Sequence, residues 1–448
     1  MTNNSQTIYA LSSGALPAAI AVVRISGPYA FEAARLLGAE SLISRKLVLT
    51  KIQPAGQEII DMALVCAFPK KQSITGEDLV ELHLHGSIAV IDELFLFFSS
   101  IKELRPAEPG EFTKRALING KMDITEVEGL ADLLASETKQ QRIQSIKLLK
   151  GELSEKYAHW RQKLIKARAE MEASLDFSDE GDVSQNTNDS RFVKKISGLI
   201  NEIEKDLVRG IAGERLRKGL KIALIGAPNV GKSSLINLLL KEDRAIVSAS
   251  AGTTRDAIEA RLNLEEVPVT LYDTAGIRET SDKIEKEGVL RSKSIAEEAD
   301  IILYIRDASA GTKEKTIELS DNKLSRIIHV YNKADLIEEK SRLNKEDFYI
   351  SCKTKQGIEG FIESLSAEVK KLTSFSDMTV APNRIRHINH LNETKESLGL
   401  ALKEIKTGKI DISADFLRAA SASLGRIVGS VDIEDVLDEI FLGFCIGK

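Results

Sequence analysis

Three short motifs occur in a fixed order along this chain, and that order restricts its fold more than any other feature. A glycine-rich loop, Gly226-Ala-Pro-Asn-Val-Gly-Lys-Ser233, follows an apolar run; Asp273-Thr-Ala-Gly276 and Asn332-Lys-Ala-Asp335 follow later ones. The first is typical of loops that cradle phosphates, the second of segments that reach a metal ion and the γ-phosphate, and the third of loops that read a base. Together they predict one nucleotide site on a parallel sheet.

The third motif predicts which nucleotide binds. The Asp335 carboxylate can accept hydrogen bonds from guanine N1 and from its exocyclic amine, which adenine does not present, so we expect GTP. Lys232 is expected to bridge the β- and γ-phosphates and to act in catalysis, and Ser233 to ligate Mg²⁺. Cys352 is expected to be a small packing residue. The other residues expected to contact the nucleotide here are Asn229, Val230, Gly231, Ser234, Asn332, Lys333, Ser351 and Lys353.

Two further segments have the character of nucleotide-sensing switches. Ala251-Gly-Thr-Thr-Arg-Asp256 is placed like a loop whose Thr completes the Mg²⁺ coordination when GTP is present, and Thr254 is the candidate. Asp273 is expected to reach Mg²⁺ through water, and the Gly276 N–H the γ-phosphate. Ile277 stands where Ras-like enzymes carry the Gln that orients the attacking water, so another group must do this. The remaining contact candidates in these segments are Ala251, Gly252, Thr253, Thr274 and Ala275.

Length and composition limit the remaining possibilities. A chain of 448 residues predicts two to four domains, and a net charge of −5 gives no general attraction to nucleic acid. The three cysteines, Cys66, Cys352 and Cys445, are too far apart for a disulfide framework or a zinc site, which fits a reducing cytoplasm. The first residues lack a signal-peptide pattern, and no run approaches the roughly 18 apolar residues of a membrane span, so we expect no membrane association.

Periodicity divides the chain into alternating α/β and helical stretches, a combined α/β and all-α multidomain fold. We expect an α/β domain over 1–118, a Ras-like GTPase domain over 216–375, and a helical domain built from 119–215 plus 383–448, into which the GTPase domain is inserted. The alternative is two unrelated helical pieces. Expected strands are 18–25, 62–68, 79–84, 221–225, 267–272, 301–305, 327–331 and 348–350; expected helices start at Tyr29 and cover 88–104, 153–175, 193–207, 234–240 and 357–372; an exposed acidic loop covers 176–189.

Outside the GTPase motifs, several short sequences carry a family resemblance. They are Ile74-Thr-Gly-Glu-Asp78, His85-Gly86, Glu111-Phe-Thr-Lys-Arg-Ala116, Asn119-Gly-Lys-Met-Asp123 and the terminal Phe444-Cys-Ile-Gly-Lys448. With them the chain resembles, over essentially its whole length, the MnmE (TrmE) family of tRNA-modification GTPases. Ser87 and Leu117 are small departures, at positions where relatives often carry Gly and Phe.

The resemblance implies a mechanism of GTP hydrolysis. GTPase domains pair across a homodimer, and a K⁺ ion between phosphate loop and switch takes the role of an arginine finger. Asn229 matches its ligand in the phosphate loop, and Glu285 matches a Glu that orients the attacking water through a second water. The loop that wraps the ion matches Ser248, Ala249, Ser250 and Thr253.

The resemblance also implies modification chemistry. The first domain is similar to a fold that binds a tetrahydrofolate derivative, 5-formyl or 5,10-methylene, and supplies a one-carbon unit. Arg24, Glu81, Lys121 and Lys448 match folate-contacting residues; Cys445 is either a catalytic thiol or an apolar filler. With the FAD-dependent flavoprotein MnmG, such proteins build a carboxymethylaminomethyl or aminomethyl group on carbon 5 of the tRNA wobble uridine.

Two other functions remain open from the sequence. One is a ribosome-assembly or signalling GTPase, a binding switch without modification chemistry, which would need neither the folate-matching residues nor the Phe444–Lys448 tail. The other is a free-standing folate aminomethyltransferase that carries a regulatory GTPase domain.

Overall fold

A computed structural model describes most of the chain, and the described residues form two compact units. It covers residues 6–176, 185–241, 259–273, 295, 297–310, 326–337, 347–373, 380–429, 441, 444 and 446–447. The first unit comprises 1–134, 146–183 and 403–448, and the second comprises 135–145 and 184–402. The sequence-based boundaries 1–118, 119–215 plus 383–448, and 216–375 stay predictions, and each unit is described by itself.

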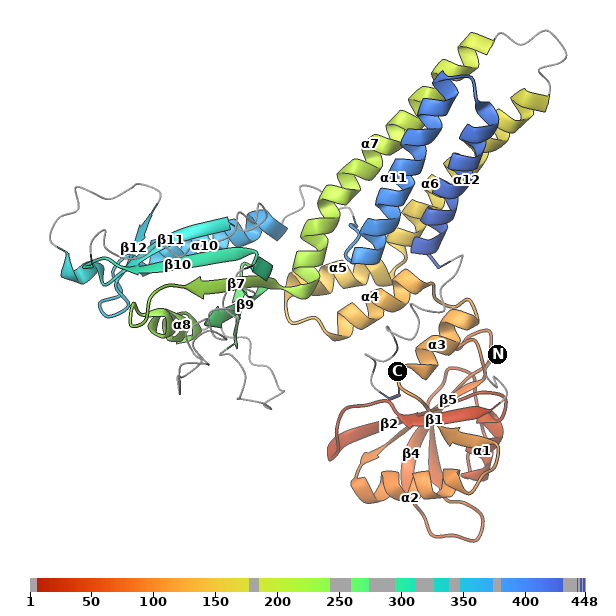
Figure 1. The fold of residues 1–448 in the computed structure, drawn as a ribbon. Coiled ribbons are helices and arrows are strands. Elements are labelled where there is room, and N and C mark those ends of the chain that lie inside the picture. The colour runs from red at the N-terminus through yellow and green to blue at the C-terminus, as the bar shows by residue number, and fades with distance from the viewer. Residues whose placement is uncertain are drawn as a thin grey trace, which may run out of the picture. The chain divides into compact units, whose positions relative to one another are not determined.

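The first unit contains a six-stranded sheet in the order β3-β4-β5-β2-β1-β6, antiparallel except for the parallel pair β1–β6 (Figure 1). Its strands are β1 (Thr7–Leu11), β2 (Ala18–Ser26), β3 (Val48–Ile52), β4 (Asp61–Phe68), β5 (Leu79–Gly86) and β6 (Leu104–Pro106). Two helices, α1 (Ala30–Leu36) and α2 (Ile88–Ser99), cover one face.

Alternation of side chains gives this sheet one face that is buried beneath α1 and α2 and an opposite face that is covered at β1, where Ile8 and Ala10 pack with Phe112, and more exposed at the other strands. In β2, Ala21, Val23 and Ile25 are buried in the core beneath α1 and α2. Because side chains alternate along a strand, Arg24 points to the opposite face, where it lies directly across from Glu81 of β5. Arg24 and Glu81 thus lie on the face that α1 and α2 do not cover.

Among the described residues, the first unit also contains four further helices and the C-terminal end of a fifth. They are α3 (Glu111–Ile118), α4 (Ile124–Leu134), the end of α5 (Lys139–Leu149), α6 (Glu152–Asp176) and α12 (Ile410–Ile427). The last two, far apart in sequence, pack side by side (Figure 1). The stripe Tyr157, Trp160 and Leu164 on α6 and the buried Leu417 and Leu424 on α12 have the spacing of helical faces that bury together.

The second unit contains the nucleotide-type sheet, in the order β12-β11-β10-β7-β9-β8, parallel except for the antiparallel edge strand β8 (Figure 1). Its strands are β7 (Leu220–Ile225), β8 (Glu259–Leu264), β9 (Val267–Asp273), β10 (Ile301–Asp307), β11 (Arg326–Asn332) and β12 (Phe348–Tyr349). Its helices are α7 (Gln185–Lys218), α8 (Lys232–Lys241), α10 (Ile358–Thr373) and α11 (Ile385–Lys406), the last continuing into the first unit.

The strands of this sheet are apolar on both faces, as expected where helices cover both. Leu224 of β7 joins the cluster that includes Phe361 of α10 and Leu235 of α8, whereas Ile225 joins a second cluster with Ile302. Elsewhere in the unit, α7 and α11 lie side by side, joined by an ion pair of 2.9 Å between Glu204 and Lys395. None of the described helices is long and apolar enough to cross a membrane.

The fold class predicted from the sequence is confirmed, and three local expectations are corrected. The helix expected over 88–104 ends at Ser99, because the hydroxyls of Ser99 and Ser100 bond to carbonyls of the last turn and the chain then forms β6. The loop expected over 176–189 is helical from Gln185, where α7 begins. An edge strand, β8, was not expected, although Ala260, Leu262 and Leu264 alternate regularly.

Candidate functional site

The phosphate-type loop connects the central strand β7 to α8, and two of its glycines have no substitute. An ideal Cβ on Gly226 would lie 2.1 Å from the Ile305 carbonyl oxygen, and one on Gly231 would lie 2.1 Å from Asn332 Nδ2. Gly231 also has φ +103°, a conformation that side-chain-bearing residues rarely adopt. The loop therefore follows the backbone path that the phosphate-loop motif requires, ending at a helix N-terminus that favours anions.

Lys232 is buried and folds back over this loop. Its Nζ donates to the carbonyl oxygens of Gly226 and Ala227, both at 2.8 Å. An ammonium group held at 4% exposure needs such acceptors, and phosphate oxygens could replace them when a nucleotide enters. The geometry therefore suits the role predicted for this lysine.

Ser233 and Asp273, predicted on Mg²⁺ from separate motifs, lie together. The Ser233 hydroxyl donates to Asp273 Oδ2 at 2.8 Å, and the Asp273 side chain is fully buried at the end of β9. Both groups offer the hard oxygens that Mg²⁺ prefers. No cluster of three or more His, Cys, Asp or Glu side chains in the described part of the chain could hold a metal alone. The residues therefore fit a Mg²⁺ ion completed by phosphate oxygens and water.

Asn332 joins the phosphate loop to the base-reading loops. Its Nδ2 donates to the Val230 carbonyl at 2.8 Å, and its Oδ1 accepts from the Cys352 N–H at 3.1 Å. Because the side chain is buried, neither bond competes with water. One amide thus fixes the relative positions of the two loops that were predicted to hold opposite ends of the nucleotide.

Lys333 and Asp335 are presented differently by the same turn. Lys333 has a left-handed φ of 63°, and its Nζ donates to Asp307 Oδ2 at 2.6 Å. Burial works to raise the pKa of Asp307, but the hydrogen bonds from Lys333 and Ser309 outweigh it and lower the pKa. Asp335 lies in the short 3₁₀ helix Ala334–Leu336 and is exposed, so its carboxylate is accessible for a base.

Cys352 agrees with the packing role expected for it. It packs against the second unit's core, and burial raises the pKa of its thiol to about 11. A thiol with that pKa stays protonated near neutral pH and is a poor nucleophile. The neighbouring Ser351 accepts from the Thr354 N–H at 3.1 Å, which shapes the loop.

Several predicted site residues lie outside the described residues, and their roles stay predictions. They are Ser248, Ala249, Ser250, Ala251, Gly252, Thr253, Thr254, Thr274, Ala275, Gly276, Glu285, Cys445 and Lys448.

The first unit brings two of the folate-matching residues together. Arg24 Nε and Glu81 Oε1 are 2.8 Å apart on the open face of the sheet, and His83 Nε2 lies 3.5 Å from the other oxygen of Glu81. Lys121 donates instead to the Lys71 carbonyl at 2.9 Å. The arrangement gives the open face one cation and one carboxylate, both partly exposed, which can meet the charged and N–H groups of a ligand.

A buried ion network beneath this face was missed by sequence reasoning. Arg115, only 2% exposed, pairs with Glu77 at 2.8 Å and with Glu111 at 2.9 Å; Glu111 also pairs with Arg105 at 2.6 Å. Burial works to raise the pKa of Glu111, but hydrogen bonds from Arg105, the Glu108 N–H and Arg115 lower it. The network joins the 74–78 and 111–116 motifs; the four-residue spacing of Glu111 and Arg115 was the only sequence signal.

The described part of the C-terminal tail lies against the first unit's sheet. Ser12 Oγ donates to the Gly447 carbonyl at 2.8 Å, and Ile446 forms a bridge with Pro109. Phe441 and Phe444 pack around Gly110, where an ideal Cβ would lie 2.6 Å from the Phe441 ring. The tail motif therefore belongs to the same unit as Arg24 and Glu81.

Family models match most of the chain, and solved structures are similar to part of it. The family model described as MnmE helical domain matches residues 124–445, and that described as GTP-binding protein TrmE N-terminus matches residues 7–121. Among solved structures, a crystal structure of Era from Aquifex aeolicus aligns at 24% identity over 40% of this chain and 67% of that chain, with a TM-score of 0.27.

Curated relatives match along the whole chain. The tRNA modification GTPase MnmE of Agrobacterium fabrum is 45% identical over 100% of both chains, and that of a Bradyrhizobium species is 42% identical over 100% of both. The MnmE of Brucella ovis is 42% identical over 99% of this chain and 98% of its own. With such similarity over the full length, the chain belongs to the MnmE family of tRNA modification GTPases.

Proposed function

We propose that this chain is a K⁺-activated GTPase that acts with the flavoprotein MnmG to install a carboxymethylaminomethyl or aminomethyl group at carbon 5 of the tRNA wobble uridine. The observation that carries the proposal is the presence, in one chain, of a formed GTP-type site and of a second polar site at Arg24 and Glu81, with the C-terminal tail in the same unit. A simple GTP switch would need only the first. Function on tRNA implies a cytoplasmic location.

The GTP step uses residues with separate tasks. Lys232 holds the β- and γ-phosphate oxygens, and Asp335 selects guanine through its N1 and amine protons. Ser233 and Asp273 would hold Mg²⁺, with Thr254 as a further ligand, and the bound ion would supply positive charge to the phosphate oxygens. Water attacks the γ-phosphorus, the bond to the β–γ bridging oxygen breaks, and GDP and phosphate leave.

Two tasks fall to residues known only from the family pattern. Asn229, Ser248, Ser250 and Thr253 would hold K⁺, which would supply positive charge where negative charge develops. The backbone at Asn229 is left-handed, with φ 63°, as part of the loop's path. Glu285 orients the attacking water, because Ile277 has no polar atom with which to do so. Exchange of K⁺ for Na⁺ at equal ionic strength, and Glu285→Ala, should each suppress hydrolysis while GTP binding persists.

The second site is proposed to hold a tetrahydrofolate derivative, which supplies the one-carbon unit. Glu81 accepts hydrogen bonds from the pterin N–H groups, while Arg24, Lys121 and Lys448 hold carboxylates. Cys445 belongs to the same terminal motif as Lys448. Because Arg24 and Glu81 already form an ion pair at 2.8 Å, a ligand must either break this ion pair or bind to both of its members.

A homodimer is proposed on the open face of the first sheet. Exposed apolar side chains lie on the face that carries Glu81: Leu49 is 65% exposed and has Leu64 as its cross-strand neighbour, with Met62 on the same strand as Leu64, and Ile20, 61% exposed, lies across His85 of β5. Exposed apolar side chains on one face of a sheet favour an interaction site, and a second copy of the chain is the occupant that the family pattern favours.

The proposal is tested by nucleoside mass spectrometry of bulk tRNA from cells that lack this chain. Complementation with the wild-type chain should restore 5-aminomethyl-type uridines, and complementation with Arg24→Ala should not, although its GTP hydrolysis should continue. A nucleoside profile that does not change when the chain is absent would leave the GTP site intact and favour the ribosome-assembly or signalling switch.

A further inference from the structure

Residues 135–145 belong to the second unit, although they interrupt the first unit in sequence. The chain on either side, up to residue 134 and from residue 146, is part of the first unit. A displacement of this segment is therefore passed on through its covalent ends, whatever the arrangement of the two units. The contacts that hold this segment in place therefore affect both units.

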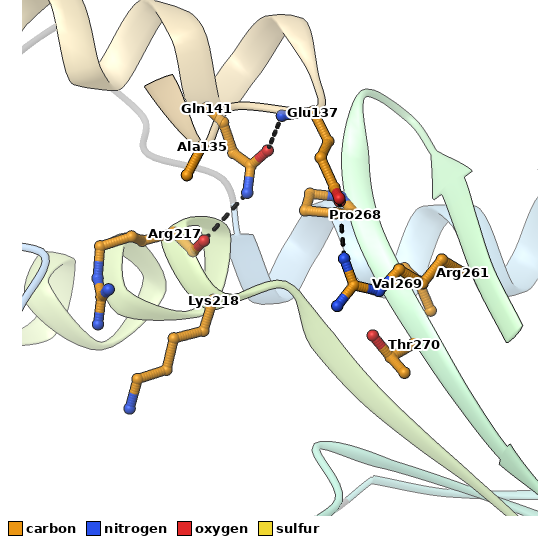
Figure 2. A pocket seen from close by; sticks show the side chains of 9 residues that line it. All are labelled: Ala135, Glu137, Gln141, Arg217, Lys218, Arg261, Pro268, Val269 and Thr270. Carbon is orange, nitrogen blue, oxygen red and sulfur yellow. Dashed lines mark hydrogen bonds and ion pairs between the residues drawn. The ribbon is translucent and has the colours of Figure 1, made fainter. Parts of the chain in front are cut away.

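One side of the segment is held by hydrogen bonds to the C-terminal part of α7. Gln141 Nε2 donates to the Arg217 carbonyl at 3.0 Å, and Gln144 Nε2 donates to the Gly213 carbonyl at 3.2 Å. The carbonyl of the Gln141 side chain accepts from the Glu137 and Thr138 N–H groups at 2.9 and 3.2 Å, which fixes the turn before α5 (Figure 2). These bonds hold the segment against α7 and fix its internal turn.

The other side is held by one ion pair to the hairpin β8–β9. Arg261 of β8 lies 2.8 Å from Glu137, and Figure 2 shows the two side chains pointing toward each other. The hairpin connects the two candidate nucleotide-sensing segments: β8 begins at Glu259, shortly after Thr254, and β9 ends at Asp273, which binds the Ser233 hydroxyl. The pair therefore connects a nucleotide-linked element to the segment.

A cavity of about 150 Å³ lies beside this pair, lined among others by Gln141, Lys218, Pro268 and Thr270. It leaves room for the hairpin to shift against the segment, which close packing would oppose. The cations around it already have partners: Lys218 pairs with Glu214 at 2.7 Å, and Arg217 Nε donates to the Asn383 carbonyl at 2.9 Å. The cavity is thus better suited to movement than to holding an anion.

The pair contributes little to folding. Its side chains are 50% and 29% exposed, and exposed ion pairs change a folding equilibrium by about fivefold at most. An interaction of that size is large enough to bias a hairpin between two positions and small enough to be removed without unfolding the unit.

We propose that Glu137 and Arg261 are positioning residues that transmit nucleotide-dependent movement of the β8–β9 hairpin to segment 135–145 and, through its covalent ends, to the first unit. Coupling of this kind needs an element whose position both ends can bias, and the hairpin is that element. The inference rests on the proposed function insofar as the movement serves tRNA modification.

The first test measures backbone hydrogen exchange of the full chain with GDP and with a non-hydrolysable GTP analogue. In the wild type, exchange of the hairpin and of residues 135–145 should both change with the nucleotide. In Arg261→Gln and Glu137→Gln, the hairpin should still respond, while the response of 135–145 should fall by threefold or more. The charge-swapped double variant, Glu137→Arg with Arg261→Glu, should restore it. A response of 135–145 that persists in both single variants overturns the proposal.

The second test compares GTP hydrolysis with the yield of modified uridine in complemented cells. Both single variants should hydrolyse GTP within about twofold of wild type and yield several-fold less modified uridine. Glu204→Gln is the matched control, because it removes a similar exposed ion pair, to Lys395 at 2.9 Å, away from the hairpin. Normal uridine yield in the single variants contradicts the coupling role. Failure of the wild-type chain to restore modification contradicts the proposed function alone, since hydrogen exchange does not depend on tRNA.

Discussion

At the scale of single residues, the GTP-type site depends on positions where the chemistry of one side chain, or its absence, decides the geometry. Asn332 bonds to both Val230 and Cys352, so the phosphate and base loops share one buried amide. The motifs made Asn332 a site candidate from sequence alone. Its two partners could not be predicted, because both are backbone groups and a backbone group carries no sequence signal.

Gly231 provides the sharpest test at this scale. In Gly231→Ala, the added methyl would clash with Asn332 Nδ2, and φ +103° would cost about 1–2 kcal/mol for a side-chain-bearing residue. We expect guanine-nucleotide affinity to fall by about tenfold or more, measured by equilibrium binding of a fluorescent GDP analogue. Gly360→Ala is the control, because a Cβ there meets nothing within 4 Å and α10 is an ordinary helix. Equal affinity of the two variants would show that the loop tolerates the methyl.

Glu111 makes a prediction about pH. Its pKa is lowered in the folded chain, so the stability it contributes is present above its ordinary pKa of 4.5 and is lost as pH falls through the lower, folded value. We therefore expect the first unit to lose stability below pH 4.5, and Glu111→Gln to weaken that dependence while lowering stability at neutral pH, where Arg115 loses a buried partner.

Urea unfolding between pH 3 and 7 measures the free energy of unfolding. The slope of this free energy against pH is compared between the wild type and the variants. Glu32→Gln removes a carboxylate from an exposed pair with Arg35, and it should keep the wild-type slope. A wild-type slope in Glu111→Gln would mean that the acid sensitivity arises elsewhere.

At the scale of elements, the strands and helices with strong periodicity were predicted, and those decided by their neighbours were not. The strands expected over 62–68, 221–225 and 301–305 all exist, because apolar runs between turn residues are local signals. The helix expected over 88–104 was predicted too long. Its last residues belong to β6, which is a strand because it pairs with β1, and local sequence does not show this pairing. The ion pair of Arg115 with Glu77 was likewise not predicted, because the two residues lie 38 positions apart in the sequence.

The β8–β9 hairpin makes a prediction of its own. Its two-residue turn places Glu265 and Glu266 at φ 52° and 65°, whereas such turns favour Asn-Gly. We expect Glu265→Asn with Glu266→Gly to stabilise the second unit by about 1 kcal/mol, because the left-handed strain is relieved. Urea unfolding measures the gain. The double variant Glu265→Gln with Glu266→Gln removes the two charges and keeps the strain; an equal gain there would assign the effect to charge.

At the scale of the whole molecule, the grouping of residues into two units was beyond sequence reasoning. Segment 135–145 carries few apolar side chains, and its tertiary bonds to Arg217, Gly213 and Arg261 tie it to the second unit. Tertiary hydrogen bonds of this kind leave no periodic pattern in a sequence. The candidate GTP residues were predictable because they cluster in motifs, whereas the partners that position them were not.

Two units predict two unfolding transitions with different responses to ligand. A guanine nucleotide binds residues of the second unit, so saturating GDP should raise that unit's unfolding temperature and leave the first unit's nearly unchanged. At a hundredfold excess over the dissociation constant, the stabilisation is about 2.7 kcal/mol. Differential scanning calorimetry with and without GDP checks this, and at the same GDP concentration Gly231→Ala should reduce the stabilisation to about half or less, because its affinity is expected to be at least about tenfold weaker. A single transition that shifts as a whole would mean that the units unfold together.

The packing of α12 on α6 has a consequence for the folding of the chain during its synthesis on the ribosome. The stripe of Tyr157, Trp160 and Leu164 is synthesised long before Leu417 and Leu424, which cover the same helix pair. At the usual rates of translation, the 219 residues between positions 183 and 403 take on the order of ten to forty seconds. During that interval the aromatic stripe of α6 has no α12 to pack against. We therefore expect nascent chains to depend on chaperones at this stage more than the finished protein does.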